Sequence, residues 1–161
     1  MSEFGIVIFP TAYSMQPVEL AKAVESRGLD SIFVPEHTHI PASRRTPYPA
    51  GGDLPKEYSN TYDPFVFLTA CAAVTEHIKL GTGICLVVER DVLTLAKEIA
   101  SLDRISDGRF ILGIGAGWNA EEMENHGIDY SKRWKVVREK ILAMRELWTK
   151  DEAEFHGEFV D

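Results

Sequence analysis

RFILGIGAGWNAEE, residues 109–122, places a glycine-rich turn and a tryptophan between an apolar strand and the start of a helix. The run 109–114 has the apolar character of a strand, and Asn119 stands three residues before Glu122, the spacing of a capping box. The glycines at the junction are Gly113, Gly115 and Gly117. A flat or anionic ligand can approach the backbone at such a place. The same residues are equally typical of a plain strand-to-helix turn.

The rest of the chain repeats this strand-then-helix order. We expect strands at 4–10, 31–35, 78–85 and 109–114. We expect helices that begin at Pro17, after Asp63, after Asp91 and at Ser131. This alternation predicts right-handed crossovers and a parallel sheet, because β-α-β connections take that hand. Both part of a (β/α)8 barrel and an open doubly wound sheet satisfy it.

The C-terminal part of the chain carries two further expectations. The helix that begins at Ser131 has an apolar stripe at helical spacing, which predicts a buried face. The stripe consists of Trp134, Val137, Ile141, Met144 and Trp148. After Asp151 the sequence EAEFHGEFVD weakly alternates, like the start of a hairpin.

Composition narrows the class of protein. The chain has 161 residues, of which 45% are hydrophobic, and this length suffices for one globular core. The net charge of −8 makes nucleic acid and anionic membranes poor partners. No apolar run approaches the length of a membrane span. Cys71 and Cys85 stand apart without CxxC spacing, and we expect a cytoplasmic protein with reduced thiols.

The chemically distinctive residues all fall at the carboxyl ends of expected strands. They are Glu36 and His37, Gly83 and Ile84, and the stretch from Gly115 to Asn119. Barrel enzymes and doubly wound folds both place their sites at this end of the sheet. A proline- and glycine-rich loop at 38–62 follows the second strand and is typical of a lid or binding loop. GIGAGW lacks the last glycine of the dinucleotide fingerprint GxGxxG, which argues against a Rossmann domain.

His37 and His39 form an HxH pair, which some barrel hydrolases use to bind a divalent metal. Such a site needs further ligands from other strands. The remaining histidines, His77, His126 and His156, do not follow expected strands. A metal-dependent hydrolase is therefore one alternative, and His37 as a hydrogen-bonded structural residue is another.

Four stretches together resemble the luciferase-like monooxygenase superfamily. They are VPEH at 34–37, LGTGI at 80–84, TLAKEIASLDRISDGR at 94–109 and LGIGAGWNAEE at 112–122. The likeness runs from residue 4 to about residue 160, and its last two stretches are the most specific. The most similar branch is that of deazaflavin (coenzyme F-420) dependent oxidoreductases of actinobacterial type, followed by flavin mononucleotide (FMN) enzymes.

The resemblance implies a fold, a cofactor and site residues. It implies a (β/α)8 barrel that binds F-420, with FMN as the alternative, at its carboxyl-end opening. It also implies a non-proline cis peptide at Gly83–Ile84 and a proton-transferring role for His37. The cofactor-binding residues that it implies are Glu36, His37, Gly83, Ile84, Gly115, Ala116, Gly117, Trp118 and Asn119. Some deazaflavin dehydrogenases carry an acidic Glu after the glycine turn, where this chain has Trp118.

The length of the chain sets a limit on this interpretation. A (β/α)8 barrel takes ~250 residues, whereas 1–161 supplies four β-α units. We therefore expect the N-terminal half of a single barrel domain that acts on a small organic substrate. A non-catalytic half-barrel that binds cofactor or serves assembly is a further alternative. The apolar edge strands 4–10 and 109–114 predict a homodimer or higher oligomer, which light scattering would detect.

Overall fold

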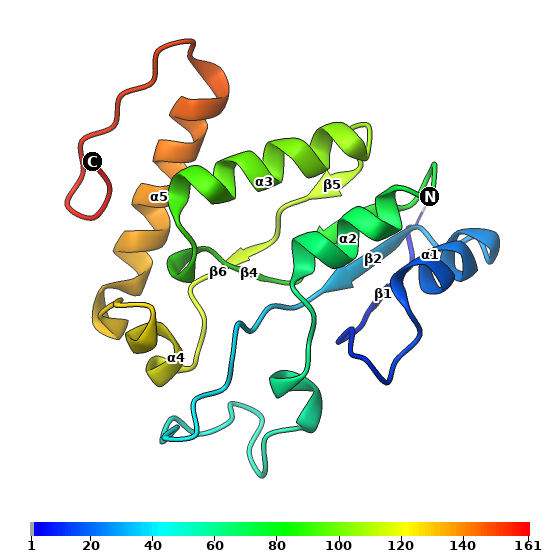
Figure 1. Ribbon diagram of the computed structural model, residues 1–161, viewed down its shortest axis with the longest axis horizontal. Coiled ribbons are helices and arrows are strands. Elements are labelled where there is room, and N and C mark those ends of the chain that lie inside the picture. The colour runs from blue at the N-terminus through cyan, green and yellow to red at the C-terminus, as the bar shows by residue number, and fades with distance from the viewer. Residues whose placement is uncertain (1) are drawn as a thin grey trace.

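A computed structural model describes residues 2–161 (Figure 1). Four parallel strands pair in the order β1-β2-β3-β5. They are β1 Gly5–Val7, β2 Ser31–Val34, β3 Lys79–Thr82 and β5 Phe110–Ile111. A second parallel pair joins β4 Cys85–Leu86 to β6 Ile114–Gly115. The expected parallel sheet is confirmed, and β1 and β5 are its edges, as expected.

Helices follow the strands in the expected alternation. Within residues 2–161 the α-helices are α1 Pro17–Ser26, α2 Pro64–Ala72, α3 Val92–Ile105, α4 Ala120–Asn125 and α5 Arg133–Thr149. The same residues include the 3-10 turns η1 Lys56–Ser59, η2 Val87–Glu89 and η3 Tyr130–Lys132. The expected caps are confirmed, because the Asp63 and Asp91 carboxylates accept N–H bonds of 3.0 and 2.8 Å in the first turns of α2 and α3. No helix within residues 2–161 combines the length and apolar character needed to cross a bilayer.

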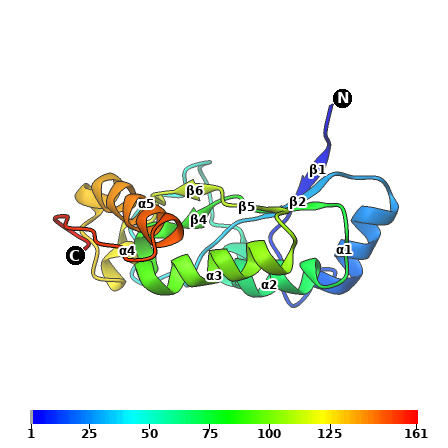
Figure 2. The same ribbon diagram turned by 90° about the horizontal axis from the view of Figure 1, so that it is seen from above.

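The two faces of the sheet differ in what covers them. α1, α2 and α3 lie on one side of the sheet (Figure 2), and Ile32 and Leu80 are fully buried. The alternate residues Val7, Phe33, Gly81 and Ile111 form one row across the four strands and point to the opposite face. On that face Val7 is 73% exposed and Ile111 is 40% exposed. In a (β/α)8 barrel this face is the filled interior.

The third and fourth strands are each divided in two, whereas we expected single strands at 78–85 and 109–114. The chain leaves β3 and β5 and pairs again as β4 and β6. At Gly113 the backbone passes so close to the third strand that an added Cβ would lie 2.1 Å from the Thr82 carbonyl oxygen. The Thr82 hydroxyl also donates a 2.8 Å hydrogen bond to the Gly113 carbonyl. This close passage explains the first glycine of the turn and interrupts the strand pairing.

The prediction of a buried apolar stripe on the last helix is only partly confirmed. Val137 and Met144 are buried, but Trp134 is 63% exposed and Trp148 is 41% exposed. α5 also begins at Arg133 rather than Ser131, after the η3 turn. The buried face of α5 includes Lys140, whose ammonium donates hydrogen bonds of 2.8 and 2.5 Å to the Val88 and Arg90 carbonyl oxygens. A lysine thus occupies a position on the buried face.

The hairpin expected after Asp151 is wrong. Residues 151–161 form no strand. The Glu139 carboxylate of α5 instead accepts N–H bonds from Glu158, Phe159 and Val160, at 3.2, 2.7 and 3.2 Å. These bonds satisfy the backbone donors that a strand partner would otherwise take, so the segment folds as a turn against α5.

Candidate active site

Three segments meet at the carboxyl end of the parallel sheet. Residues 36–38 follow β2, Gly83–Ile84 links β3 to β4, and the glycine turn follows β6. The Gly83–Ile84 peptide bond is cis, as expected. The Ile84 side chain lies over Gly115, because a Cβ added there would be 2.2 Å from Ile84 Cδ1. The structure thus brings the predicted third-strand and fourth-strand site residues into contact.

His37 is held by a buried carboxylate. Its Nδ1 lies 2.7 Å from Glu122 Oε2, and the two side chains are 6% and 1% exposed. The other oxygen, Glu122 Oε1, accepts a 3.0 Å hydrogen bond from the Thr38 backbone N–H. Glu122 therefore joins the start of α4 to the end of β2.

This arrangement contradicts the predicted capping box. The Asn119 side chain accepts no hydrogen bond from the backbone N–H groups of the first turn of α4; its Nδ2 instead donates to Glu122 Oε2 at 3.4 Å. The box does not form because Glu122 turns toward β2, where its carboxylate finds His37. Asn119 is 1% exposed, and its Oδ1 is buried without a hydrogen-bond partner among residues 2–161. Gly117, two residues before Asn119, has φ +75°, a backbone conformation that favours glycine.

The loop 38–62 contributes aromatic side chains next to His37. The Tyr58 ring lies 5.2 Å from the His37 ring, and Trp118 lies 5.8 Å from it, measured between centroids. Tyr48 packs edge-on against Trp118 at 6.1 Å, and the Arg44 guanidinium lies 5.8 Å from the Trp118 ring centroid. These aromatic side chains form a wall beside the imidazole.

Glu121 fastens this loop to α4. Its carboxylate accepts hydrogen bonds from the Arg45 and Thr46 backbone N–H groups, at 3.0 and 3.2 Å, and from the Thr46 hydroxyl at 2.6 Å. The Thr46 hydroxyl, followed by the backbone donors, lowers the pKa of Glu121 to about 2. Neighbouring glutamates of one helix thus serve different purposes, since Glu121 holds the loop while Glu122 holds the histidine.

Glu36 belongs to a separate cluster, which we call the Arg90 cluster: Glu36, Asp63, Arg90 and Glu98. Glu36 Oε2 accepts a 2.6 Å bond from the Leu86 backbone N–H, and Oε1 accepts a 2.6 Å bond from Arg90 Nε. Arg90 also pairs with Asp63, and with Glu98 at 3.0 Å. Both oxygens of the buried Glu36 are therefore occupied.

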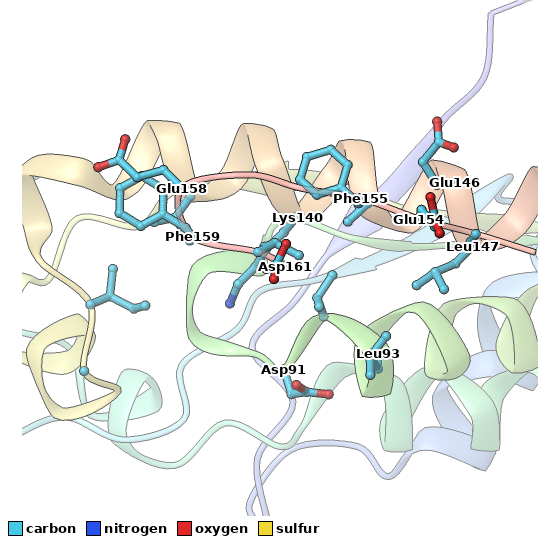
Figure 3. Close-up of a pocket in the computed structure, with 17 residues that line it drawn as sticks. Asp91, Leu93, Lys140, Glu146, Leu147, Glu154, Phe155, Glu158, Phe159 and Asp161 are labelled. Carbon is cyan, nitrogen blue, oxygen red and sulfur yellow. The ribbon is translucent and has the colours of Figure 1, made fainter.

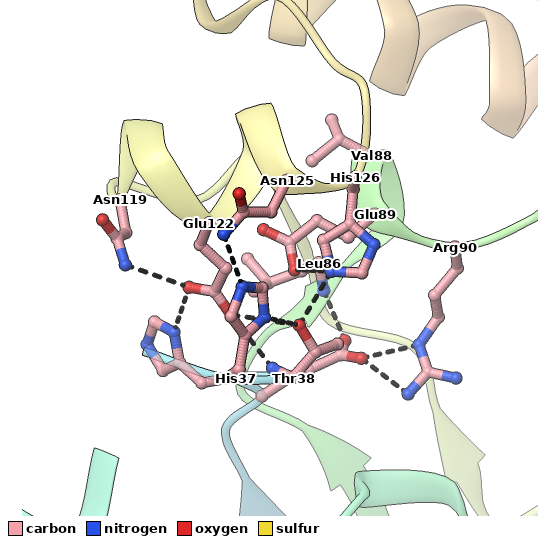
Figure 4. A network of polar contacts seen from close by, with 12 residues as sticks. His37, Thr38, Leu86, Val88, Glu89, Arg90, Asn119, Glu122, Asn125 and His126 are labelled. Atoms are coloured by element: carbon pink, nitrogen blue, oxygen red, sulfur yellow. Dashed lines mark hydrogen bonds and ion pairs between the residues drawn. The ribbon is translucent and has the colours of Figure 1, made fainter. Parts of the chain in front are cut away.

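A second cluster surrounds the imidazole, and we call it the His37 cluster: His37, Thr38, Glu89, Glu122 and His126 (Figure 4). His126 Nε2 lies 2.8 Å from Thr38 Oγ1 and 3.6 Å from Glu89 Oε2. The Glu89 side chain is 1% exposed, and neither of its oxygens has a hydrogen-bond partner within the described residues. Burial, followed by the charges of Glu122 and Glu36, raises the pKa of Glu89 to about 9.

Sequence patterns alone did not identify several members of these clusters as site residues. His126 lies four residues after Glu122, a spacing that puts both side chains on one helix face, so this signal was present. Glu89 and Arg90 end the apolar run ICLVV, and two charged residues there are a weaker signal. Nothing local in the sequence indicates that α4 faces the end of β2.

The two histidines of the HxH pair have different partners. His37 Nδ1 faces Glu122, while the His39 nitrogens face the Thr38 hydroxyl and the Asn125 side chain, each at 2.9 Å. Among residues 2–161, no group of three or more His, Cys, Asp or Glu side chains is placed to hold a metal ion.

A cavity of about 750 Å³ lies elsewhere, between the start of α3, α5 and the C-terminal segment (Figure 3). Its wall includes Asp91, Lys140, Phe155 and Phe159, and it contains none of the candidate site residues. We place the active-site candidate at the carboxyl ends of the strands, because the buried ionisable side chains and the glycine backbone converge there.

A parallel sheet with helices on one face only, as in a (β/α)8 barrel, places the chain in the (β/α)8-barrel fold class. The family model described as luciferase-like monooxygenase matches residues 5–161. The chain therefore belongs to the luciferase-like monooxygenase family, whose members are oxidoreductases and monooxygenases.

Similar proteins agree with this assignment. The uncharacterised protein Rv0953c of Mycobacterium tuberculosis is 46% identical over 160 residues, which cover 98% of this chain and 57% of that protein. An F420-dependent glucose-6-phosphate dehydrogenase of Amycolatopsis mediterranei is 29% identical over 150 residues, covering 89% of this chain and 40% of its own length.

A solved structure agrees as well. The oxygenating constituent of 3,6-diketocamphane monooxygenase from Pseudomonas putida, in complex with FMN, superposes with a TM-score of 0.77 at 25% identity. The match covers 98% of this chain and 42% of that one. The chain thus spans about half the length of the curated relatives and structures that it matches.

Proposed function

We propose that this chain supplies part of the active site of a deazaflavin-dependent oxidoreductase that acts on a small organic substrate in the cytoplasm. Coenzyme F-420 is the proposed cofactor, and the likeness to the F420-dependent dehydrogenase supports it. The two cysteines, Cys71 and Cys85, are free and buried, which suits a reducing compartment.

The residues at the carboxyl end of the sheet fit a planar ring. Gly83 and the glycine turn let the β3–β4 and β6–α4 segments approach one another closely, and Ile84 and Trp118 offer an apolar and an aromatic side chain beside them. Asn119 Oδ1, which is buried without a partner among residues 2–161, is the acceptor that we propose for an N–H group of the ring. We propose that the ring is held by His37, Gly83, Ile84, Gly115, Ala116, Gly117, Trp118 and Asn119. Glu36 has both oxygens occupied, so its proposed contribution is to position Arg90 and the β4 backbone.

The His37–Glu122 pair is the single observation that carries the proposal. Because the Glu122 carboxylate accepts from Nδ1–H at 2.7 Å, the tautomer is fixed and Nε2 is left to take or give a proton. Tryptophan at 118 carries no acid, so His37 is the proton-transferring side chain in this proposal. The bound cofactor would supply hydride transfer. The protein orients the ring and the substrate and moves the proton at His37 Nε2.

FMN is the alternative cofactor, and the likeness to the FMN-bound oxygenating constituent supports it. With FMN the reaction would be insertion of an oxygen atom into the substrate. The same residues would hold either ring, because both present a flat surface to the glycine backbone and an N–H group to an acceptor.

Titration of the native protein with coenzyme F-420 and with FMN, followed by fluorescence, tests the proposal. We expect the deazaflavin to bind more tightly. Asn119→Leu should weaken binding about tenfold, because it removes one acceptor. Asn125→Leu, on the exposed side of α4, is the matched control and should bind as the wild type does. A preference for FMN would favour the alternative, and binding of neither ring would overturn both.

A further inference from the structure

A buried carboxyl group lies beside the His37–Glu122 pair without an assigned role. Glu89 closes the η2 turn, and its side chain is 1% exposed. Neither oxygen has a hydrogen-bond partner among residues 2–161. An ionised carboxylate in such a place would lose its hydration without replacement, which is strongly unfavourable. The geometry therefore favours the protonated form of this side chain.

Contacts of polar atoms connect Glu89 to His37. Glu89 Oε2 lies 3.6 Å from His126 Nε2, which lies 2.8 Å from Thr38 Oγ1. Thr38 Oγ1 in turn lies 3.5 Å from Glu122 Oε1, and Glu122 Oε2 lies 2.7 Å from His37 Nδ1. Figure 4 shows these side chains gathered between the end of β2, the η2 turn and α4.

The charges around Glu89 come from every element packed against it. They are Glu122 and His126 from α4, Glu36 after β2, Arg90 after η2, and Lys140 from α5. The two cations are already engaged, because Arg90 bonds Glu36, Asp63 and Glu98, while Lys140 donates to backbone carbonyls. Two carboxylates that share a poorly hydrated site cannot both ionise easily, so one of them keeps a proton.

We propose that Glu89 is a hidden positioning carboxyl group, which keeps one proton and stands beside the His37–Glu122 pair without a charge of its own. The Glu122 carboxylate differs from it, because Glu122 accepts bonds from His37 and from the Thr38 backbone N–H. When Glu89 releases its proton to solvent at high pH, a second negative charge appears next to His126. His126 then binds its proton more tightly, because its Nε2 lies 3.6 Å from Glu89 Oε2. The consequence for turnover rests on the proposed function of His37, whereas the protonation of Glu89 does not.

Infrared difference spectroscopy of the native protein tests the protonation directly. We expect the carbonyl band of a protonated carboxyl group at pH 7, its loss as pH rises through about 9, and its absence from Glu89→Gln. No titrating carboxyl band in the wild type at pH 7 would overturn the proposal. Because the titration is measured in the wild type itself, the test stands even if the glutamine variant folds poorly.

Thermal unfolding between pH 5 and 9 gives a second, independent readout. The pKa of Glu89 is raised in the folded state, so its contribution to stability is full below the ordinary glutamate value and is lost as pH rises toward about 9. The melting temperature of Glu89→Gln relative to wild type should therefore increase with pH. Glu124→Gln, an exposed change on α4, should run parallel to wild type. A difference that stays constant with pH would contradict the proposal.

The pH profile of turnover separates this inference from the proposed function. With the bound cofactor, the wild type should lose activity above about pH 9, and Glu89→Gln should lack that limb. If neither ring binds, the proposed function fails while the infrared and thermal results still decide the role of Glu89. If the rings bind and the carboxyl band is absent, the inference alone fails.

Discussion

The Arg90 cluster and the His37 cluster lie at the same end of the sheet and have opposite characters. In the Arg90 cluster both Glu36 oxygens have donors, and Arg90 bonds to three carboxylates. In the His37 cluster, both oxygens of Glu89 and the neighbouring Asn119 Oδ1 are buried without partners among residues 2–161. Natural proteins seldom leave buried polar atoms unpaired, so such atoms need an explanation.

The difference in hydrogen bonding indicates that the Arg90 cluster supports the structure, whereas the His37 cluster is the candidate for chemistry. The Arg90 cluster joins the end of β2, the start of α2, β4 and α3 through bonds that occupy both oxygens of the buried Glu36. The His37 cluster contains the imidazole of His37 and a carboxyl group with a raised pKa, and the Asn119 amide oxygen beside it has no partner among residues 2–161. Locally unsatisfied groups of this kind are expected at functional sites, where stability gives way to reactivity.

The largest expected effect concerns turnover at the His37 cluster. His37→Ala should lower turnover about 10²–10⁴-fold, because the proton-transferring group is lost. This effect should exceed the loss of stability that follows from leaving the buried Glu122 carboxylate without its imidazole partner. His77→Ala, an exposed histidine outside both clusters, is the control. Steady-state kinetics and thermal unfolding on the same samples make the comparison. A collapse in melting temperature with unchanged activity per folded molecule would make His37 structural.

The Arg90 cluster should respond in the opposite way. Arg90→Met should lower the free energy of unfolding by about 3–5 kcal/mol, since it leaves the buried Glu36 carboxylate without its cation. Glu98→Gln, at the more exposed rim, should cost about 0–1 kcal/mol. Urea unfolding measures both variants. Equal costs for the two would remove the distinction between a buried and a peripheral pair.

The smallest effect is expected at the loop that Glu121 holds. At neutral pH, trypsin should cleave after Arg45 roughly five- to tenfold faster in Glu121→Gln than in the wild type. The substitution replaces the charged carboxylate that accepts hydrogen bonds from Arg45 and Thr46 with a neutral amide, which accepts weaker ones. In the wild type the pKa of Glu121 is lowered to about 2. The loop is therefore held fully above pH 4.5 and is released as pH falls toward 2.

Pepsin cleavage of residues 42–52 between pH 2 and pH 4 checks that acid dependence. The glutamine variant should be cleaved readily at every pH in this range. The wild-type loop should resist cleavage near pH 4 and approach the susceptibility of the variant near pH 2. A wild-type loop that resists cleavage equally at both pH values would show that Glu121 is not what holds it.

Features that depend on neighbouring residues in the chain were predicted well. The caps at Asp63 and Asp91 and the proline at the start of α1 and α2 were correct, because a cap joins a side chain to a backbone N–H a few residues away. The strand-helix alternation likewise follows from local apolar patterns. The same local reasoning failed at Glu122, which has capping-box spacing, because its partner His37 lies 85 residues away in the chain.

The resemblance in the glycine turn and in VPEH was enough to predict the family and the cis Gly83–Ile84 bond. It also predicted that His37 lies at the carboxyl end of a strand. These features follow from residue identity at fixed positions along a known fold. The hydrogen-bond partners of those residues could not be predicted in the same way. Glu89, His126 and Glu122 come from different elements and meet His37 and Thr38 only because α4 and η2 pack against the end of β2. Which carboxylate is charged then depends on burial and on the charges around it, and both arise when the elements come together.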